Sequence, residues 1–584
     1  MIKNYLYFLF FFITQVAFSQ TSYHRVWSVK ENRKMEIGTN WLHFIHDDVM
    51  YYLDPTTPNS IQKLTLPECN VSLLGELGTS ENTQITDLHF NGVDKIFIVG
   101  NTTQSSNFST DGVYRTTYQE NDLLNSSGFV ACFTLTGELL WCTYSDSIEM
   151  LLQLYTKITT DPQDNVYFIS YRDKELSFEN SPFQAEAKEY DTIPYTEYTA
   201  TVTKLNSQGQ FVWGTFFGTH ASYITDIKAV NDGIVLFGWA TTTTNIPLTE
   251  DFNPTYFSTP GAYQLNPNLN NDGLFNLNYF MNKFNFDGTR AWGTYVNEQT
   301  TTLPRLETSA NEIYVISSYD NTIGGFVNSA TPNAFITDPG TNVIKKMLDR
   351  FSADGTSKLW RTYTSNNIFS AYYDKVTINT DGNIWLTGQT ESFTGVSTAD
   401  AYQIARNPAT SFNFSHSDGY HLLLSKDGST VLYATYFGFD GKDEPRSLFP
   451  TTDGYYSIEK TSKNSNANNF ITQGSPLNPD EVGANTYGGT IYTRFTTDLL
   501  SSDTFDKKNI SIYPNPTTDV LYITGELQSF TNLEMHNMLG QKVLQQSVIN
   551  EEIVSVNTES INAGVYLLTL SDGNQKQTFR IVKK

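Results

Sequence analysis

Hydrophobic and polar residues alternate in short runs through most of this 584-residue chain, and small polar residues separate the runs. A period of two turns one set of side chains toward a core and the other toward solvent, which is the pattern of a β-strand. Runs such as Lys95–Gly100 and Gly233–Gly238 are apolar over the length of a strand. Asp-Gly and Asn-Gly pairs beside the runs favour tight hairpin turns. The pattern therefore predicts an all-β protein.

A hairpin phrase recurs along the middle of the chain. A glycine is followed within four or five residues by a large aromatic residue, and then by a threonine and a second aromatic residue. The first aromatic residue returns about every 70 residues, so the phrase marks a structural repeat. The five aromatic positions are Trp141, Trp213, Trp292, Trp360 and Tyr433.

A second phrase precedes each of these hairpins. Its copies include Ile85-Thr-Asp87, Ile224-Thr-Asp226 and Asp374-Lys-Val376, each followed by an apolar run. A unit with both phrases holds about four strands and cannot bury both of its faces alone. Stacking such units around an axis buries them, which predicts a β-propeller with one sheet in each blade.

The repeats resemble the SBBP-type β-propeller repeat. The resemblance covers roughly residues 80–440 and includes Gly261-Ala-Tyr263-Gln264 and Asp400-Ala-Tyr402-Gln403, between the two halves of a unit. Weaker copies lie outside this range. The resemblance implies the same propeller fold that the repeated hairpins predict.

The ends of the repeat region indicate how the propeller closes. Trp41–Gly78 has the layout of a shortened first unit, and a final unit that begins at Ser447 stops near Phe495, before its last strand. His24–Val29 has the pattern of a last strand that lacks a unit. Pairing this strand with the final unit would remove two open sheet edges. We therefore expect seven blades over residues 20–500, with six as the alternative.

The C-terminal region, residues 509–584, alternates as short strands and predicts a small β-sandwich. It follows a polar joint at residues 501–508. Its motifs closely resemble the type A C-terminal sorting domain of the type IX, or Por, secretion system of Bacteroidetes-like bacteria. The resemblance implies recognition by the outer-membrane secretion machinery and delivery through the periplasm to the cell surface or the medium. The matching residues are Tyr513, Pro514, Asn515, Pro516, Gly540, Gly564, Tyr566, Lys583 and Lys584.

The N-terminus has the pattern of a cleaved signal peptide. Lys3 precedes the apolar run Leu6–Ile13, and Ala17-Phe-Ser19 fits cleavage after Ser19. The run is much shorter than the roughly 20 apolar residues that span a bilayer. We expect residues 1–19 to be removed, and no transmembrane segment after cleavage.

The charge composition makes one class of binding partner, nucleic acid, unfavourable. Lys and Arg total 37 against 61 Asp and Glu, a net charge of −24, which repels nucleic acid phosphates and suits solubility outside the cell. Of three cysteines, Cys132 and Cys142 flank a turn at Thr136-Gly137. A two-residue turn would set Cys132 opposite Trp141, so a disulfide would need a longer turn or a bulge.

No catalytic, cofactor or metal motif is found. The eight histidines lack ligand spacing, and the loop Asn268–Gly273 has Tyr279 where a calcium loop requires a glutamate. Asp-Gly pairs could hold cations, but turn chemistry explains them. They are Asp287-Gly288, Asp354-Gly355, Asp381-Gly382 and Asp427-Gly428.

The repeated tryptophans and the long insertions are the features from which a binding role can be judged. One equivalent mid-strand tryptophan per unit is more typical of packing between blades than of sugar stacking. The insertions Glu175–Glu197 and Thr241–Asn276 are candidate loops for glycan or protein ligands. The sequence thus predicts an exported, non-catalytic binding or scaffold module. The alternative is a polysaccharide-active enzyme with paired carboxylates in the central channel.

Overall fold

The computed structural model falls into two compact units, Met1–Thr497 and Asp498–Lys584. No α-helix occurs in the residues that the structure describes, so none of them forms a helix able to cross a membrane. The expected signal peptide (1–19) and the joint at residues 501–508 lie outside the described residues. The described residues are 23–31, 42–118, 126–145, 156–173, 177–186, 198–218, 222–242, 255–267, 276–296, 304–321, 328–341, 343–369, 375–406, 417–438, 443–462, 487–497, 510–525, 527, 530–537, 541–548, 553–571 and 576–584.

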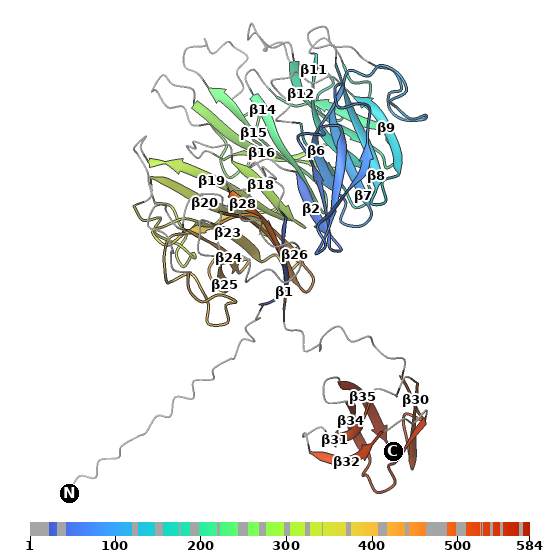
Figure 1. Ribbon diagram of the computed structural model, residues 1–584. Coiled ribbons are helices and arrows are strands. Elements are labelled where there is room, and N and C mark those ends of the chain that lie inside the picture. Colours follow the sequence, from blue (N-terminus) through green and yellow to red (C-terminus); the bar gives the residue numbers. More distant parts are fainter. Residues whose placement is uncertain are drawn as a thin grey trace, which may run out of the picture. The chain divides into compact units, whose positions relative to one another are not determined.

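The described part of the first unit consists of seven four-stranded antiparallel sheets (Figure 1). In six of them the four strands follow one another along the chain, as hairpins joined by the turns of the repeated phrases predict. These six sheets are β2 (His43–His46), β3 (Val49–Leu53), β4 (Ser60–Thr65), β5 (Asn70–Glu76); β6 (Thr83–Phe90), β7 (Lys95–Thr102), β8 (Ser127–Thr134), β9 (Leu139–Ser145); β10 (Ile158–Thr160), β11 (Val166–Asp173), β12 (Tyr198–Leu205), β13 (Phe211–Phe216); β14 (Ser222–Val230), β15 (Gly233–Thr242), β16 (Asn276–Asn285), β17 (Arg290–Tyr295); β18 (Arg305–Ser309), β19 (Glu312–Asp320), β20 (Ile344–Phe351), β21 (Lys358–Tyr363); and β22 (Lys375–Ile378), β23 (Ile384–Thr390), β24 (Asp418–Leu424), β25 (Val431–Phe437).

The seventh sheet joins the two ends of the unit. Its order is β1-β28-β27-β26, with β1 (Tyr23–Glu31), β26 (Asp443–Thr451), β27 (Gly454–Ser462) and β28 (Tyr487–Thr497). β1 pairs with β28 from Tyr23↔Thr497 to Glu31↔Thr490, with a bulge near Val26. The predicted pairing of the N-terminal strand with the final unit is therefore confirmed.

The repeated tryptophan connects four of the sheets to the next. The Trp213 indole lies against the turn at Gly288 in the following sheet and donates a hydrogen bond to the Phe286 carbonyl at 3.2 Å. Gly288 has a φ of +85°, a conformation that glycine adopts without strain and that leaves room for the ring. The prediction that these tryptophans pack between sheets is confirmed. The other indoles donate to the next sheet in the same way, in the pairs Trp141–Ser207, Trp292–Ala353 and Trp360–Lys426.

Contacts also join the remaining sheets. The amide of Ile85 in β6 donates to the Pro58 carbonyl of the first sheet at 2.8 Å. Tyr23 of β1 packs edge-on against Tyr433 of β25, with ring centroids 4.6 Å apart. His43 of β2 hydrogen-bonds Ser447 of β26 at 2.8 Å, so the seventh sheet contacts the first.

The two cysteines of β8 and β9 do not form a disulfide. Cys132 is paired with Trp141, as the short-turn register predicts, while Cys142 is paired with Ala131. Neighbouring residues of a strand point to opposite faces, so the two thiols enter different hydrophobic clusters. Burial raises the pKa of Cys132 to about 12 and also raises that of Cys142, so both are structural thiols.

The described part of the second unit consists of two antiparallel sheets that share one hydrophobic core. Leu521, Leu533, Val554 and Leu568, all buried, contribute to this core. The arrangement agrees with the expected β-sandwich. The sheets are β29 (Ile510–Tyr513), β30 (Val520–Gly525), β33 (Ile553–Asn557), and β32 (Lys542–Ser547), β31 (Asn532–Asn537), β34 (Gly564–Ser571), β35 (Lys576–Lys583).

Candidate functional site: a charged cavity

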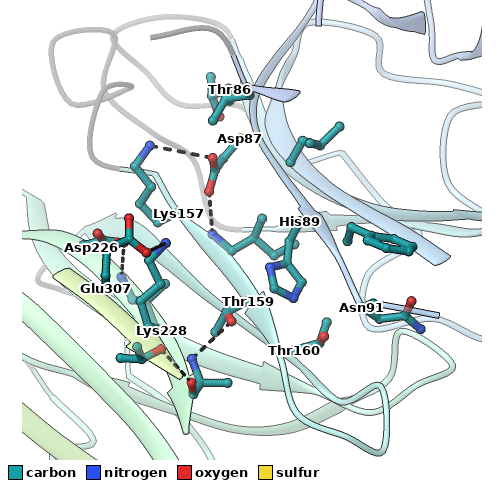
Figure 2. A pocket seen from close by; sticks show the side chains of 18 of the residues that line it. Thr86, Asp87, His89, Asn91, Lys157, Thr159, Thr160, Asp226, Lys228 and Glu307 are labelled. Carbon is teal, nitrogen blue, oxygen red and sulfur yellow. Dashed lines mark hydrogen bonds and ion pairs between the residues drawn. The ribbon is translucent and has the colours of Figure 1, made fainter. Parts of the chain in front are cut away.

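The first strands of the sheets surround a cavity of 1360 Å³. Its walls come mainly from β6, β10, β14 and β18, with Lys375 from β22 and Leu42 just before β2. Figure 2 shows charged side chains from β6, β14 and β18, with Lys157 just before β10, gathered on one wall. Residues far apart in sequence thus line one cavity because five sheets contribute residues of their first strands, β6, β10, β14, β18 and β22.

Strand register places equivalent residues of the sheets at one level of the cavity. Asp87 pairs with Val99, Asp226 with Phe237, Arg305 with Ile316 and Lys375 with Thr387; in each case the partner is the fourth residue of the apolar run on the second strand. We call this set the first ring. Six of its seven members line the cavity. In sheet order the ring is Leu42, Asp87, Lys157, Asp226, Arg305, Lys375 and Ser447.

A second ring lies two residues further along each strand. Its members His89, Thr159, Lys228 and Glu307 also line the cavity, because side chains two apart share a face of a strand. The remaining members are Phe44, Thr377 and Phe449.

Asp87 is held by two groups of the neighbouring sheet. Its carboxylate lies 3.7 Å from Lys157 Nζ and accepts a hydrogen bond from the Ile158 amide at 2.9 Å. Burial raises the pKa of Asp87 above its ordinary value, although Lys157 acts in the opposite direction. The result is an ion pair across two sheets that stabilises the wall and partly neutralises the acid.

Lys228 lies among carboxylates of two sheets. Its Nζ is 3.8 Å from Glu307, and Asp226 of its own strand is a further anionic neighbour. Glu307 and Asp226 raise the pKa of Lys228, so the ammonium stays charged. Burial raises the pKa of Glu307 in turn.

Arg305 and Lys375 differ from the other charged residues of the cavity. The side chain of neither forms a hydrogen bond or an ion pair with any residue that the structure describes. Burial, followed by the positive charge of Arg305, lowers the pKa of Lys375 to about 8. The two adjacent cations of the first ring are thus available to a ligand.

Hydrogen bonds between neighbouring sheets hold the walls in place. The Ala229 amide donates to Thr159 Oγ1 of the preceding sheet at 3.3 Å, and Thr308 Oγ1 of the next sheet donates to the Ala229 carbonyl at 3.1 Å. These bonds join three successive inner strands. The charged residues therefore project from a backbone that is fixed before any ligand arrives.

Histidine lies in the cavity at one position and in the packed interior at another. His89 belongs to the second ring, and burial lowers its pKa to about 4. His421 of β24 is buried against β27, where its Nε2 is 2.7 Å from Glu459. Burial lowers the pKa of His421 to about 3 and raises that of Glu459, so the interior disfavours the charged form of each group.

The Asp-Gly pairs are turns. Asp287 Oδ1 accepts the Thr289 amide at 2.9 Å, and Asp354 Oδ1 accepts the Thr356 amide at 3.1 Å. Side-chain hydrogen bonds, from Thr289 to Asp287 and from Ser352 to Asp354, lower the pKa of both carboxylates, and the amide bonds act in the same direction. The described residues hold no group of three or more His, Cys, Asp or Glu side chains suited to a metal ion. The loop Asn268–Gly273 lies outside them.

The described parts of the two insertions pack against the core. Tyr256 and Phe257 are buried, and Tyr256 donates from its hydroxyl to Gln184 of the other insertion at 2.8 Å. The repeated Ala-Tyr-Gln motif also joins sheets, since the Tyr263 amide donates to the Gly355 carbonyl at 3.0 Å. These segments brace neighbouring units; their expected role in ligand binding stays a prediction.

The cavity itself was not located from the sequence. Asp87 and Asp226 were part of a repeated phrase, but their place at the inner strand was not recognised. Lys157, Arg305 and Lys375 occupy the same strand position as the two aspartates but carry the opposite charge. The repeated phrase therefore does not show that the five residues are structurally equivalent. In five of the seven units a charged residue stands directly before an apolar residue of the first strand, and this is the signal that could have revealed the cavity.

In the second unit, the Tyr513–Pro516 motif fastens the last strand. The Asn515 side chain donates to the Arg580 carbonyl at 2.8 Å and accepts the Val582 amide at 2.9 Å. Tyr566 is buried and donates to the Asn562 carbonyl at 2.8 Å, next to Gly564. The flanking bonds Tyr513-Pro514 and Asn515-Pro516 are cis. Lys583 and Lys584 end the chain beside Thr517, and Gly540 lies outside the described residues.

Residues 511–584 match the family of secretion system C-terminal sorting domains. The match implies delivery by type IX secretion, through its machinery, to the cell surface or the extracellular space. No curated protein shows significant sequence similarity to the chain.

Solved structures resemble the chain only remotely. One from a study of two prolyl endopeptidases has a TM-score of 0.37 at 7% identity, over 87% of this chain and 55% of that one. An oligogalacturonate lyase in complex with manganese has a TM-score of 0.29 at 9% identity, over 59% and 72%. A Synechocystis apocarotenoid oxygenase mutant has a TM-score of 0.33 at 8% identity, over 68% of this chain and 71% of that one. Likenesses this weak carry no argument about activity.

Proposed function

We propose that this chain, which ends in a secretion system C-terminal sorting domain, is an exported binding protein built on a seven-bladed β-propeller of SBBP-type repeats. In this proposal its ligand is a glycan or a protein, and the propeller acts without catalysis. The domain at residues 511–584 supports the export route.

The sheet contacts support a closed ring of seven blades. Each of the seven sheets contacts the next, and β26 of the last contacts β2 of the first through Ser447 and His43. The N-terminal strand β1 completes the last sheet, an arrangement that joins the two ends of the ring. A propeller of six blades would account for only six of the seven described sheets.

The observation that carries the binding role is the charged cavity. Its volume exceeds that of a typical site for a small molecule, and its polar groups are positioned by hydrogen bonds between sheets. Asp87 and Glu307 are each engaged by a lysine, which favours recognition over proton transfer. A rigid, polar and concave surface of this kind suits binding of a hydrophilic ligand.

A glycan array probed with the purified mature chain, combined with a reducing-sugar assay on the bound glycans, tests this proposal. Binding without sugar release is the expected result. Binding that is abolished by substitutions in the cavity would place the ligand there. Sugar release by the purified chain would overturn the non-catalytic role.

A polysaccharide-active enzyme is the second candidate. It is favoured by the raised pKa values of Asp87 and Glu307, since a carboxylic acid that stays protonated can act as a general acid. In that case Asp87→Asn or Glu307→Gln would abolish sugar release and leave binding intact.

A further inference from the structure

We propose that Arg305 and Lys375 form the binding site for the acidic group of an anionic sugar, a carboxylate or a sulfate, within the central cavity. This inference rests on the proposed binding function and specifies the class of ligand. It starts from the order of charges in the first ring and from the partners that each charge has.

The order of charges makes one side of the first ring cationic. Passing from sheet to sheet, the ring reads acidic at Asp87, basic at Lys157 and acidic at Asp226, and then basic twice, at Arg305 and Lys375. The next member, Ser447, is neutral. Two cations therefore stand side by side on contacting strands β18 and β22.

The nearby carboxylates are engaged elsewhere. Asp87 is paired with Lys157 across 3.7 Å, and Glu307 with Lys228 across 3.8 Å. Glu307 is an electrostatic neighbour of both Arg305 and Lys375, but its ion pair is with Lys228 and not with either of them. A second carboxylate that could neutralise the two cations is not present among the described lining residues near them.

The charge state of Lys375 would respond to an anion bound beside it. Burial and the charges of Arg305, Arg446 and Lys346 disfavour its ammonium form and Glu307 favours it, which together bring the pKa of Lys375 to about 8. Removing a charge from water without pairing it is costly, and an anion between the two cations would repay that cost. In a chain of net charge −24 this cationic pair is a local exception.

The two side chains complement each other chemically. A guanidinium presents a planar fork that accepts a carboxylate or sulfate through two parallel hydrogen bonds, and an ammonium adds a compact charge. The cavity volume leaves room for sugar residues beyond the acidic group. The hydroxyls of such sugars can bond to the polar side chains of the inner strands.

The experiment follows the Lys375 resonance directly. The full mature chain is reductively methylated on its lysines with ¹³C-formaldehyde and a borohydride as hydride donor, which preserves the charge, and the resonance of Lys375 is assigned with Lys375→Gln. D-Glucuronate and glucose 6-sulfate are the anionic probes, and D-glucose is the neutral control. We expect the anionic probes, and not glucose, to raise the pKa at which Lys375 titrates and to bind more weakly above about pH 8.

Variants separate the site from the fold. Arg305→Gln should weaken binding of the preferred probe about tenfold, the loss expected for one charge-assisted hydrogen bond, while Arg305→Lys retains part of the affinity. Lys63→Gln on β4, outside the cavity, is the matched control and leaves binding unchanged. Melting temperatures establish that each variant is folded.

The outcomes distinguish this inference from the proposed function. Whichever anionic probe produces the larger shift identifies the acidic group. Equal shifts with glucose, or none with either acid, overturn the anion site. If the array still shows glycan binding that Arg305→Gln leaves intact, the binding function stands and only this inference fails.

Discussion

Each repeated tryptophan depends on a glycine in the next sheet. The Trp213 ring occupies the space beside Gly288, and a Cβ atom at Gly288 would lie 2.9 Å from that ring and 2.2 Å from Pro182 Cγ. Real side chains do not approach so closely, so the indole would have to move. Glycine in this turn leaves the space that the indole of the preceding sheet fills, so the choice of glycine allows the two sheets to pack closely.

Gly288→Ala should therefore destabilise the protein more than Gly261→Ala. Both glycines have a φ of +85°, but Gly261 has open space around its Cβ position, so both variants carry the same backbone strain. The clash should add about 1–3 kcal/mol at Gly288. Denaturant unfolding of the two variants checks this, and equal losses would show that the tryptophan contact contributes little.

A second residue-scale prediction concerns acid. Burial and the charge of Lys228 lower the pKa of His89 to about 4, whereas the unfolded chain takes up this proton near pH 6.5. Above pH 6.5 His89 is neutral in both the folded and the unfolded chain, and the folded state loses nothing. As the pH falls from 6.5 toward 4 only the unfolded chain binds the proton, so the free energy of unfolding decreases by on the order of 1 kcal/mol per pH unit. His89→Gln should lose less stability over this range than the parent chain. Parallel curves of unfolding free energy against pH would contradict it.

At the scale of elements, β1 is a strand of the seventh sheet supplied from the other end of the unit. It pairs with β28 along its length and places Tyr23 between Trp385, Tyr433 and Tyr455. Without it, β28 would become an open edge.

Deletion of residues 20–30 should thus sharply destabilise the first unit, by at least about 3–5 kcal/mol, the usual loss for one buried aromatic side chain. The melting temperature measures this, with Val26→Ala at an exposed bulge position as the control. An unchanged melting temperature after deletion would refute the role of β1 in closing the sheets.

The last strand of the second unit depends on Asn515. Asn515→Ala removes two hydrogen bonds to β35 and should destabilise that unit by about 1–3 kcal/mol. Asn515→Asp keeps the acceptor oxygen, so its stability should lie between those of the parent chain and Asn515→Ala. Hydrogen exchange of the Val582 amide in the full chain reports the loss, and unchanged protection in the alanine variant would disprove it.

At the scale of the whole molecule, the described chain forms two compact units with separate hydrophobic cores. Each core is complete within its own unit, so the first unit does not require the second for its packing. Export, by contrast, depends on the sorting domain.

A chain truncated after Thr497 should accordingly melt at the temperature of the first unit in the full protein and yet remain in the periplasm of a host with type IX secretion. Calorimetry and fractionation of the cells test the two halves of this prediction. A lower melting temperature would reveal that the units stabilise each other, and secretion of the truncated chain would exclude the C-terminal domain as the required signal.

The repeated features were accessible from sequence because they follow from local rules. Turn glycines, the period of two and the spacing of Trp141, Trp213, Trp292 and Trp360 predicted the hairpins and the packing between sheets. The unmatched strand at His24–Val29 predicted the pairing that β1 makes. The cavity could not be found in this way, because Lys157, Arg305 and Lys375 share no residue type with Asp87.

The sequence by itself therefore determined the strands, their hairpins, the pairing of the two ends and the export route, since each follows from a local pattern, from comparing the repeated units or from a motif read in order. Only the tertiary structure decided which charges meet. Asp87 and Lys157 lie on different sheets, as do Lys228 and Glu307, and their pairing leaves Arg305 and Lys375 without an ion-pair partner among the described residues. Such a balance depends on distances between sheets and on burial, neither of which is encoded in the spacing of residues along the chain.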